Sequence, residues 1–379
     1  MKRRERLMAT LRGEPVDRPP VCFYEINGYD ENTSNADPLN IYSHPSWAPL
    51  IRLAREKSDR IVIRGVPFKN APPDPLAELR KSETHYEQGS LIGSTTIRAG
   101  RRTFTTRWRR DPDVNTVWTL EHLLKDADDL RAWLELPMAE FGGEPETSGV
   151  LKAEEGLGDT GIVSIDVGDP ILGVAPMFDM GEFTVVALTE QKLFHAALER
   201  CASVLYLQIE AIARALPGRL WRIVGPEYAS PPYLPPRLFR EYVANYDKPI
   251  VEAIAKHGGF PRIHCHGRLH DILDDIASTG CTGLDPIEPP PQGDVDMLYV
   301  RQKYGKQMVL FGNLEASDLE NLPAAEFEKK IVRAVREGTA GEGRGMVLMP
   351  SACPYGRVLS PRALGNYEKM VEVIERGAG

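Results

Sequence analysis

The stretch PRIHCHGRLHDIL, residues 261–273, places two histidines on either side of a cysteine. Alternate side chains of a β-strand share a face, so His264 and His266 would point together and Cys265 the opposite way, into packing between strand and helix. The spacing therefore indicates either a metal-binding pair or two imidazoles that bond to the backbone in the core or in a loop.

A third ligand for such a site is available further along the chain. Cys353 follows the strand-like run MVLMPSA and could reach the same point as His264 and His266. Imidazole and thiolate are ligands that zinc prefers, and three protein ligands leave a fourth position open. Glu227, after the run WRIVGP, would complete the shell or be displaced by substrate. Taken alone, Cys353 is equally well explained as a small buried apolar side chain.

Other polar residues also stand where strand-like runs end. In a barrel of parallel strands, chemistry collects at the carboxyl ends of the strands and in the loops that follow them. Any one of these residues is more simply explained as a loop cap, and only their coincidence at one end of a sheet indicates a site. The residues are Glu25, Asn27, Asp166, Asp169, Glu227, Asp285 and Asn313.

The C-terminal half must position these groups, and it alternates strand-like with helix-like segments. Five strands are expected at 220–225, 261–266, 281–287, 307–313 and 345–353. The helices that follow them are expected at 236–257, around Leu269, Ile272, Leu273 and Ile276, at 294–304, around Phe327, Ile331, Val332 and Val335, and from an N-cap at Ser360 with Pro361 in the first turn. Five βα units predict a parallel sheet with helices outside.

Three more strands are expected at 19–26, 59–65 and 161–167. The total of about eight predicts an α/β fold of the (β/α)8 TIM barrel type, with residues 1–379 as a single domain. A doubly wound open sheet is the alternative, and the lack of a glycine-rich fingerprint after an early strand argues against it.

One region interrupts the alternation. Residues 93–111 predict a β-hairpin that turns at Ala99–Gly100, so we expect an inserted hairpin region near 90–115 within an insertion, 90–150, that covers one end of the barrel. Its arginines favour a solvated face over an anion-binding or partner-docking surface. They are Arg98, Arg101, Arg102, Arg107, Arg109 and Arg110.

The composition limits the function classes. The net charge of −8 argues against a protein whose main partner is nucleic acid. Five scattered cysteines without a CxxC pair fit a reducing compartment. The basic start is not followed by an apolar run, and no stretch approaches transmembrane length, so we expect a cytoplasmic protein with no membrane partner.

The chain resembles a known superfamily at both ends. RERLMATLRGEPVDRPPV, residues 4–21, resembles the opening of the uroporphyrinogen decarboxylase superfamily. The stretches PRIHCHG, GCTGLDPIEP, LFGNLEASDL and VLMPSACP follow in the order and spacing of that family. The resemblance implies a (β/α)8 barrel. True decarboxylases carry arginines after the opening prolines to hold substrate carboxylates, whereas residues 21–50 contain no Lys or Arg, which argues against a porphyrinogen substrate.

The resemblance is closer to the corrinoid-dependent methyltransferase branch, which binds zinc through an H-x-C pair and a later cysteine. It implies zinc ligands at His264 and Cys353, with His266 in place of the first cysteine. Glu227, from its place after a strand, stays the candidate for a fourth ligand. The histidine at 266 makes the ion more Lewis acidic, which suits polarising an ether oxygen or an amine better than activating a thiol.

The resulting hypothesis is a zinc-dependent methyltransferase. It would move a methyl group between a small methylated substrate and the cobalt of a corrinoid (cobalamin) carried by a partner protein. The leading substrate candidate is a methoxylated aromatic undergoing O-demethylation. Asp285 and Asn313 would orient ligands or substrate, and the arginine hairpin could steer the corrinoid protein. The expected substrate-binding residues are Glu25, Asn27, Tyr29, Tyr228 and Asp166. The alternatives are a metal-free decarboxylase-like lyase using Asp166 or Asp169, and a barrel that only binds a corrinoid or tetrapyrrole.

Overall fold

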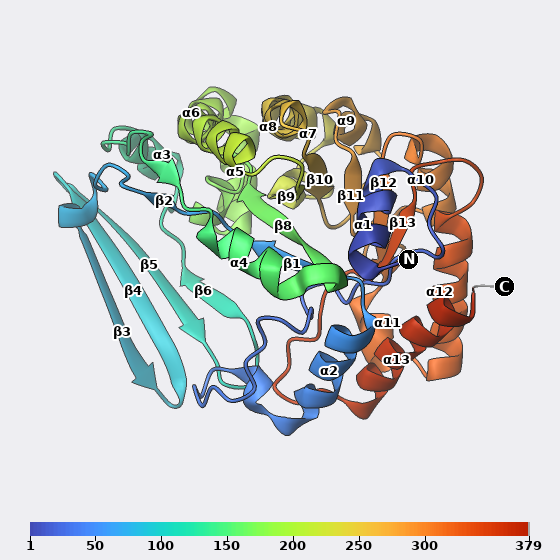
Figure 1. The fold of residues 1–379 in the computed structure, drawn as a ribbon. Coiled ribbons are helices and arrows are strands. Elements are labelled where there is room, and N and C mark those ends of the chain that lie inside the picture. Colours follow the sequence, from blue (N-terminus) through green and yellow to red (C-terminus); the bar gives the residue numbers. More distant parts are fainter. Residues whose placement is uncertain (378–379) are drawn as a thin grey trace.

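The computed structural model describes residues 1–377, and its centre is a curled parallel sheet with helices outside (Figure 1). The sheet has seven strands in the order β1-β8-β9-β10-β11-β12-β13. They are β1 (Arg60–Arg64), β8 (Gly161–Gly168), β9 (Leu220–Val224), β10 (Phe260–His264), β11 (Gly283–Asp285), β12 (Val309–Leu314) and β13 (Met346–Pro350). The five βα units expected in the C-terminal half are thus present in the predicted order.

The predicted strand at 19–26 is not formed, so a complete eight-stranded barrel is not confirmed. The position between β13 and β1 is taken by an irregular segment with a single parallel bridge, Val21 to Leu348. Leu348 N–H donates to the Pro20 carbonyl at 2.9 Å, and Asp59 N–H donates to the Val21 carbonyl at 2.7 Å. The segment cannot extend its ladder because its prolines lack N–H groups and Tyr24 has a φ of 56°.

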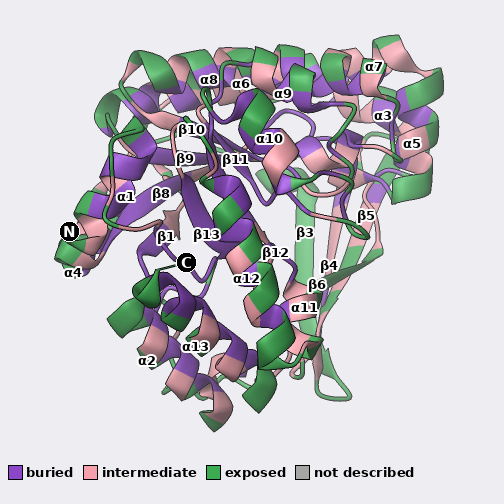
Figure 2. Cartoon of the chain, turned by 90° about the vertical axis from the view of Figure 1, so that its right-hand side faces the viewer, coloured by how far each residue is buried: buried purple, intermediate pink, exposed green. Residues whose placement is uncertain are grey.

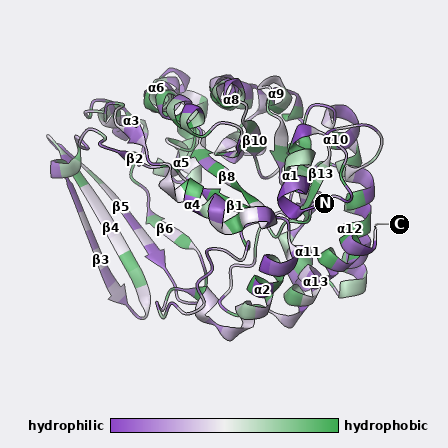
Figure 3. Ribbon diagram, in the orientation of Figure 1, coloured by the Kyte–Doolittle hydropathy of each residue, from purple (hydrophilic) through white to green (hydrophobic). Residues whose placement is uncertain are grey.

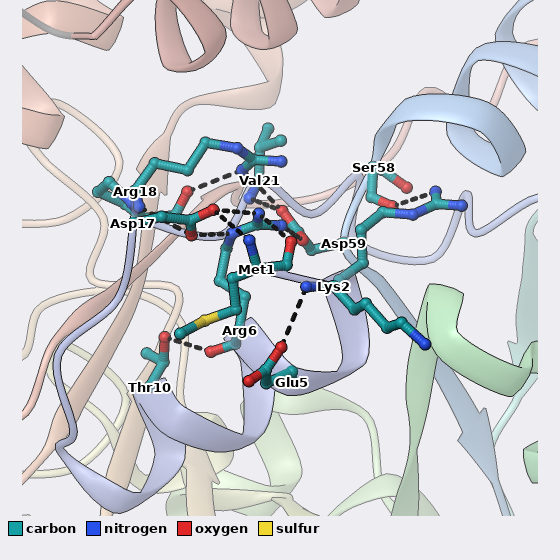
Figure 4. A network of polar contacts seen from close by, with 12 residues as sticks. Met1, Lys2, Glu5, Arg6, Thr10, Asp17, Arg18, Val21, Ser58 and Asp59 are labelled. Carbon is teal, nitrogen blue, oxygen red and sulfur yellow. Dashed lines mark hydrogen bonds and ion pairs between the residues drawn. The ribbon is translucent and has the colours of Figure 1, made fainter.

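The chain start is fixed to this segment by a network of charged side chains (Figure 4). Arg6 of helix α1 (Arg3–Arg12) donates to Asp59 at 2.7 Å and to Asp17 at 2.7 and 2.8 Å. Asp59 is fully buried and also accepts bonds from Arg18 and from the Val21 N–H, both at 2.9 Å. Asp17 and Arg18 of the D-R-P-P-V stretch thus bind Arg6 of α1 and Asp59, and they join the chain start to the residue before β1.

The remaining helices surround the sheet. They are α2 (Ala48–Lys57), α3 (Ala127–Leu134), α4 (Ser148–Leu157), α5 (Met180–Thr189), α6 (Gln191–Ala215), α7 (Pro236–Phe239), α8 (Asn245–Lys256), α9 (Leu273–Ser278), α10 (Met297–Tyr304), α11 (Ala316–Asn321), α12 (Ala324–Gly338) and α13 (Pro361–Arg376). A π-helical turn at Arg240–Ala244 separates α7 from α8 within the predicted helix 236–257. The predicted N-cap is confirmed, because the Ser360 Oγ accepts the Ala363 N–H at 3.0 Å.

The insertion between β1 and α4 is larger than the predicted hairpin. Strands β4 (Ser90–Ala99) and β5 (Arg102–Arg110) form the predicted hairpin, which turns at Gly100–Arg101, one residue later than predicted. Strands β3 (Arg80–Glu87) and β6 (Val117–Glu121) extend it to four antiparallel strands. The insertion also contains a two-stranded sheet, β2 (Phe68–Lys69) with β7 (Glu144–Pro145). Ile97 and Phe104 pack into the main core, so one face near the turn is anchored.

The main core lies between the sheet and the helices (Figure 2). Figure 3 shows hydrophobic residues along β8, whereas the surrounding helices alternate between hydrophobic and hydrophilic residues, as expected when only one stripe of each helix is covered. Within residues 1–377, no helix is both long and apolar enough to cross a membrane.

Candidate active site at the carboxyl ends of the strands

His264 and Asp285 meet at the ends of two neighbouring strands. They are register partners on β10 and β11, and His264 Nδ1 lies 2.9 Å from Asp285 Oδ2. Asp285 is completely buried, and Arg262, two residues before His264 on the same face, forms an ion pair with its other oxygen at 3.2 Å. Burial alone would raise the pKa of Asp285, but the charges of Arg262 and His264 lower it to about 2. Asp285 is therefore an anion that orients His264.

His266 has its own carboxylate partner. Its Nδ1 lies 2.8 Å from Glu288 Oε1, and the second oxygen of Glu288 accepts the Gly267 N–H at 2.8 Å. Burial works to lower the pKa of His266, but the bond to Glu288 and the nearby Glu227 raise it above its usual range. The two imidazole rings are 4.7 Å apart between centroids and nearly perpendicular. The predicted pair is thus brought together, and Cys265 is fully buried in the core as expected.

The histidine pair has the outer partners typical of metal-ligating imidazoles. A metal-bound histidine usually donates its second ring N–H to a carboxylate, which fixes the ring and its tautomer. Asp285 and Glu288 occupy that position at Nδ1 of His264 and His266, and among the described residues neither Nε2 has a hydrogen-bond partner. Two imidazole nitrogens are thus available for a cation or for a substrate atom.

The third predicted ligand does not complete the set. Cys353 Sγ donates to Glu25 Oε2 at 3.4 Å, and burial together with Glu25 raises the pKa of its thiol strongly. Within residues 1–377, no three His, Cys, Asp or Glu side chains are grouped closely enough to hold a metal ion. The predicted donors fit zinc in kind, but their arrangement does not.

A cavity of about 400 Å³ opens beside the histidine pair. Its wall includes His266, Glu227 and Tyr228, so it unites three predicted site residues from the ends of β9 and β10. The Gly225 N–H donates to Glu227 Oε2 at 3.2 Å, which turns this carboxylate back toward the end of β9. Most of the remaining wall is apolar or aromatic: Met180, Pro231, Pro232, Tyr233 and Pro291. The cavity suits a small, largely apolar ligand.

Arg222 organises the predicted carboxylates on the other side of His264. It binds Asp166 at 2.7 and 3.3 Å, donates to the Tyr24 hydroxyl at 2.9 Å and approaches Glu25 to 3.9 Å. The ring of Tyr24 stacks on His264 with 6.2 Å between centroids. Asp166 and Glu25 are therefore linked to the histidine pair through Arg222, as ion-paired groups.

Three predicted site residues are engaged elsewhere. The Asn27 side chain closes its own loop by accepting the Tyr29 N–H at 2.9 Å. The Tyr29 ring lies under the Arg64 guanidinium, and its hydroxyl donates to the Lys152 carbonyl. Asn313 lines a separate cavity of about 330 Å³ next to α12. The structure gives these residues no contact with the histidine pair.

Two buried carboxyls near Glu227 were not recognised as a pair from the sequence. Asp169 follows β8 and Asp247 lies on α8, and burial raises the pKa of both, with Asp247 acting on Asp169 and Glu227 acting on both. Among the described residues, neither oxygen of Asp247 has a hydrogen-bond partner. Gly225 has a φ of 129°, and a Cβ there would lie 1.9 Å from Asp169 Oδ1, so the site requires glycine.

Other contributors also escaped prediction. Glu288 sits in a proline-rich loop and gives no local signal. Arg222 and Arg262 could have been found from the sequence, because each places a cation in an otherwise buried apolar strand, where the charge needs a partner.

Comparisons with known proteins place this geometry in context. The sequence pattern of the family described as uroporphyrinogen decarboxylase (URO-D) matches residues 166–376, which include β9 to β13. No curated protein matches the sequence. Among solved structures, a methyltransferase from Methanosarcina mazei is similar over 99% of each chain with a TM-score of 0.60 and 17% sequence identity, which shows a shared fold.

Proposed function

The chain belongs to the uroporphyrinogen decarboxylase family, and within it we propose a methyltransferase that moves a methyl group from a small methylated substrate to the cobalt of a corrinoid carried by a partner protein. The proposal draws on the motif resemblance and on the fold shared with the Methanosarcina mazei methyltransferase. The observation that carries it is the His264 and His266 pair, fixed by two carboxylates, with His266 in the wall of a largely apolar cavity.

The residues of the cavity suit removal of a methyl group from a heteroatom. When the bond between methyl carbon and heteroatom breaks, the electron pair stays on the heteroatom and its charge must be neutralised. His266 is the group we assign to this task, because Glu288 holds a proton on its ring and its Nε2 can donate one to the heteroatom. The reduced corrinoid of the partner protein would supply the nucleophile that accepts the methyl group. The products are the demethylated substrate and a methylated corrinoid.

The lining of the cavity favours a methoxylated aromatic over a porphyrinogen. Tyr228 and Tyr233 offer aromatic faces, and Glu227 offers a hydrogen-bond acceptor to a hydroxyl or amine of the substrate. Arg268 is the one Lys or Arg in the described wall and is exposed, and Arg222 is already paired with Asp166. A substrate with many carboxylates would lack the cationic partners that their burial requires.

Zinc is the second candidate for neutralising the leaving heteroatom, and the carboxylate at Nδ1 of each imidazole favours it. His264 and His266 would hold the ion through Nε2, and Cys353 would join only after leaving Glu25. Because the third ligand is not in place, no step of the reaction is assigned to the metal.

The test uses the purified protein with chemically reduced cobalamin and three probes: a methoxybenzoate, a methyl thioether and a methylamine. We expect at least one probe, most readily the methoxybenzoate, to be demethylated as the reduced cobalamin is consumed. His264→Gln and His266→Gln should each lower the rate by about 100-fold or more. His270→Gln is the matched control, since His270 is exposed in the same loop, where it pairs with Asp271 and stacks on Tyr299 away from the cavity wall.

Metal analysis separates the two candidates for charge neutralisation. One equivalent of zinc that is lost in both His264→Gln and His266→Gln would transfer the role to the metal. A metal-free protein that retains full activity would assign it to His266. If none of the three probe classes is demethylated, the methyltransferase proposal fails, whatever the metal content.

A further inference from the structure

Strand β3 forms one edge of the four-stranded inserted sheet and faces solvent. It pairs with β4 on one side, and within the described chain no strand pairs with its other side. All eight of its side chains are exposed, on both faces of the sheet. Figure 1 shows β3 as the outermost strand, away from the helices, and Figure 2 shows it as exposed. An edge of this kind presents a row of free backbone donors and acceptors.

The two edges of this sheet differ in a way that singles out β3. Strand β6, at the other edge, is five residues long, and its pairing is interrupted by a register shift between Arg107 and Trp108. Short length and bulges are the usual devices that stop an edge from pairing further. Strand β3 keeps an unbroken register with β4 over eight residues and contains no proline. Of the two edges, β3 is therefore the one whose backbone is free to accept another strand.

We propose that β3 pairs with β3 of a second copy of this chain, antiparallel about a two-fold axis through Thr84, and so joins two inserted sheets into one. In this register Lys81 lies opposite Glu87 of the second copy, and Glu83 lies opposite His85. The two-fold axis repeats both pairs. The same patch thus complements itself, as a symmetric two-chain interface requires.

The charges distinguish this register from its neighbours. A slip that keeps the same side chains on the same face moves the pairing by two residues. A slip in one direction places Glu83 opposite Glu83 and Lys81 opposite His85, and a slip in the other places Glu83 opposite Glu87. Like charges directly opposite are destabilising, so the register centred on Thr84 is the favoured one.

The charges of β3 are free to exchange partners. Within one chain Lys81 pairs with Glu83 at 2.5 Å and His85 approaches Glu87 to 3.8 Å, and all four side chains are more than 60% exposed. Exposed pairs of this kind contribute little, so replacing them by pairs across the interface costs little. The backbone hydrogen bonds of the new ladder then contribute favourably to the free energy of association. This inference does not depend on the proposed function.

Sedimentation of the full chain at micromolar concentration tests the proposal through a charge exchange. Lys81→Glu faces Glu87 of the second copy, and Glu87→Lys faces Lys81, so each should weaken the dimer at least about tenfold. The double variant Lys81→Glu with Glu87→Lys restores opposite charges and should return the dissociation constant close to that of the wild type. A wild-type chain that stays monomeric overturns the proposal, as does a double variant as weak as the single ones.

A cross-link checks the register independently. Thr84→Cys places two thiols opposite each other across the axis, and mild oxidation should give a disulfide-linked dimer. Ser82→Cys is the matched control, because its neighbour across the interface is Tyr86. Equal cross-linking of both variants would contradict the register, and circular dichroism of every variant confirms that these exposed substitutions leave the fold intact.

Discussion

Replacing Asp285 by asparagine tests whether the carboxylate at the centre of the site is an anion held by its neighbours. The side chain keeps its size but loses the charge that faces Arg262 and His264. An ordinary aspartate has a pKa of 3.8 and Asp285 has one of about 2, a difference that corresponds to about 2 kcal/mol of stability. The largest expected loss of stability is about 5 kcal/mol, the cost of leaving the buried Arg262 cation without a partner. We therefore expect Asp285→Asn to lower the free energy of unfolding by about 2 to 5 kcal/mol at pH 7.

The pH dependence of this loss follows from the lowered pKa of Asp285. The stability that the charge provides is present above pH 3.8, and it is lost as the pH falls through about 2. The difference between wild type and Asp285→Asn should thus be constant from pH 7 to pH 5 and shrink below pH 4.

Urea unfolding followed by tryptophan fluorescence measures the effect, with Asp271→Asn as control. Asp271 is 70% exposed and pairs only with His270, so its replacement should cost less than about 1 kcal/mol. Equal losses for Asp285→Asn and Asp271→Asn, or a loss that does not shrink in acid, would refute the assignment of Asp285 as a buried anion.

Three further predictions concern other buried carboxyls. Asp247→Asn should stabilise the protein by about 1–3 kcal/mol at pH 7, because burial raises the pKa of Asp247 and, among the described residues, its oxygens lack hydrogen-bond partners. The gain, measured as the rise in melting temperature, should grow from pH 4 to pH 7 as the carboxyl of the wild type ionises. Asp59→Ala should lower the free energy of unfolding in urea by about 3–5 kcal/mol, because Arg6 and Arg18 lose their shared partner. Asp159→Ala, which removes an exposed pair with Lys2, is the control, and a loss for Asp59→Ala as small as that of the control would contradict the prediction. The rate of methyl transfer should fall at high pH, as His266 loses its proton, and Glu288→Gln should shift this fall to a lower pH because Glu288 raises the pKa of His266. An unchanged pH profile would exclude His266 as the proton donor.

The strand alternation around residue 264 was enough to predict the central feature of the site. Because β10 places alternate side chains on opposite faces, His264 and His266 come together and Cys265 enters the core. Their partners could be predicted only in part. Asp285 ends the neighbouring strand, which the sequence indicates, whereas Glu288 returns to His266 through a loop whose path depends on the whole fold.

The failed expectations have local physical causes. The apolar run at 19–26 resembles a strand, but its prolines remove ladder donors and Tyr24 turns the backbone away. Asn27 has the polarity of a site residue, yet its side chain is used to close its own loop. In both cases local backbone conformation and bonding determine the structure of the segment, and these cannot be predicted from composition or from the periodicity of apolar residues.

The closing segment at residues 20–22 has a consequence for the order of events during synthesis. Its backbone bonds join Leu348, near the end of the chain, to Asp59, near the beginning. Asp59 is synthesised long before Leu348, so the seam between β13 and β1 can close only after β13 has left the ribosome. Until then the buried side of the first residues has no cover, and a chain that ends before β13 would keep that side open permanently. We expect such truncated products to depend on chaperones or to be degraded.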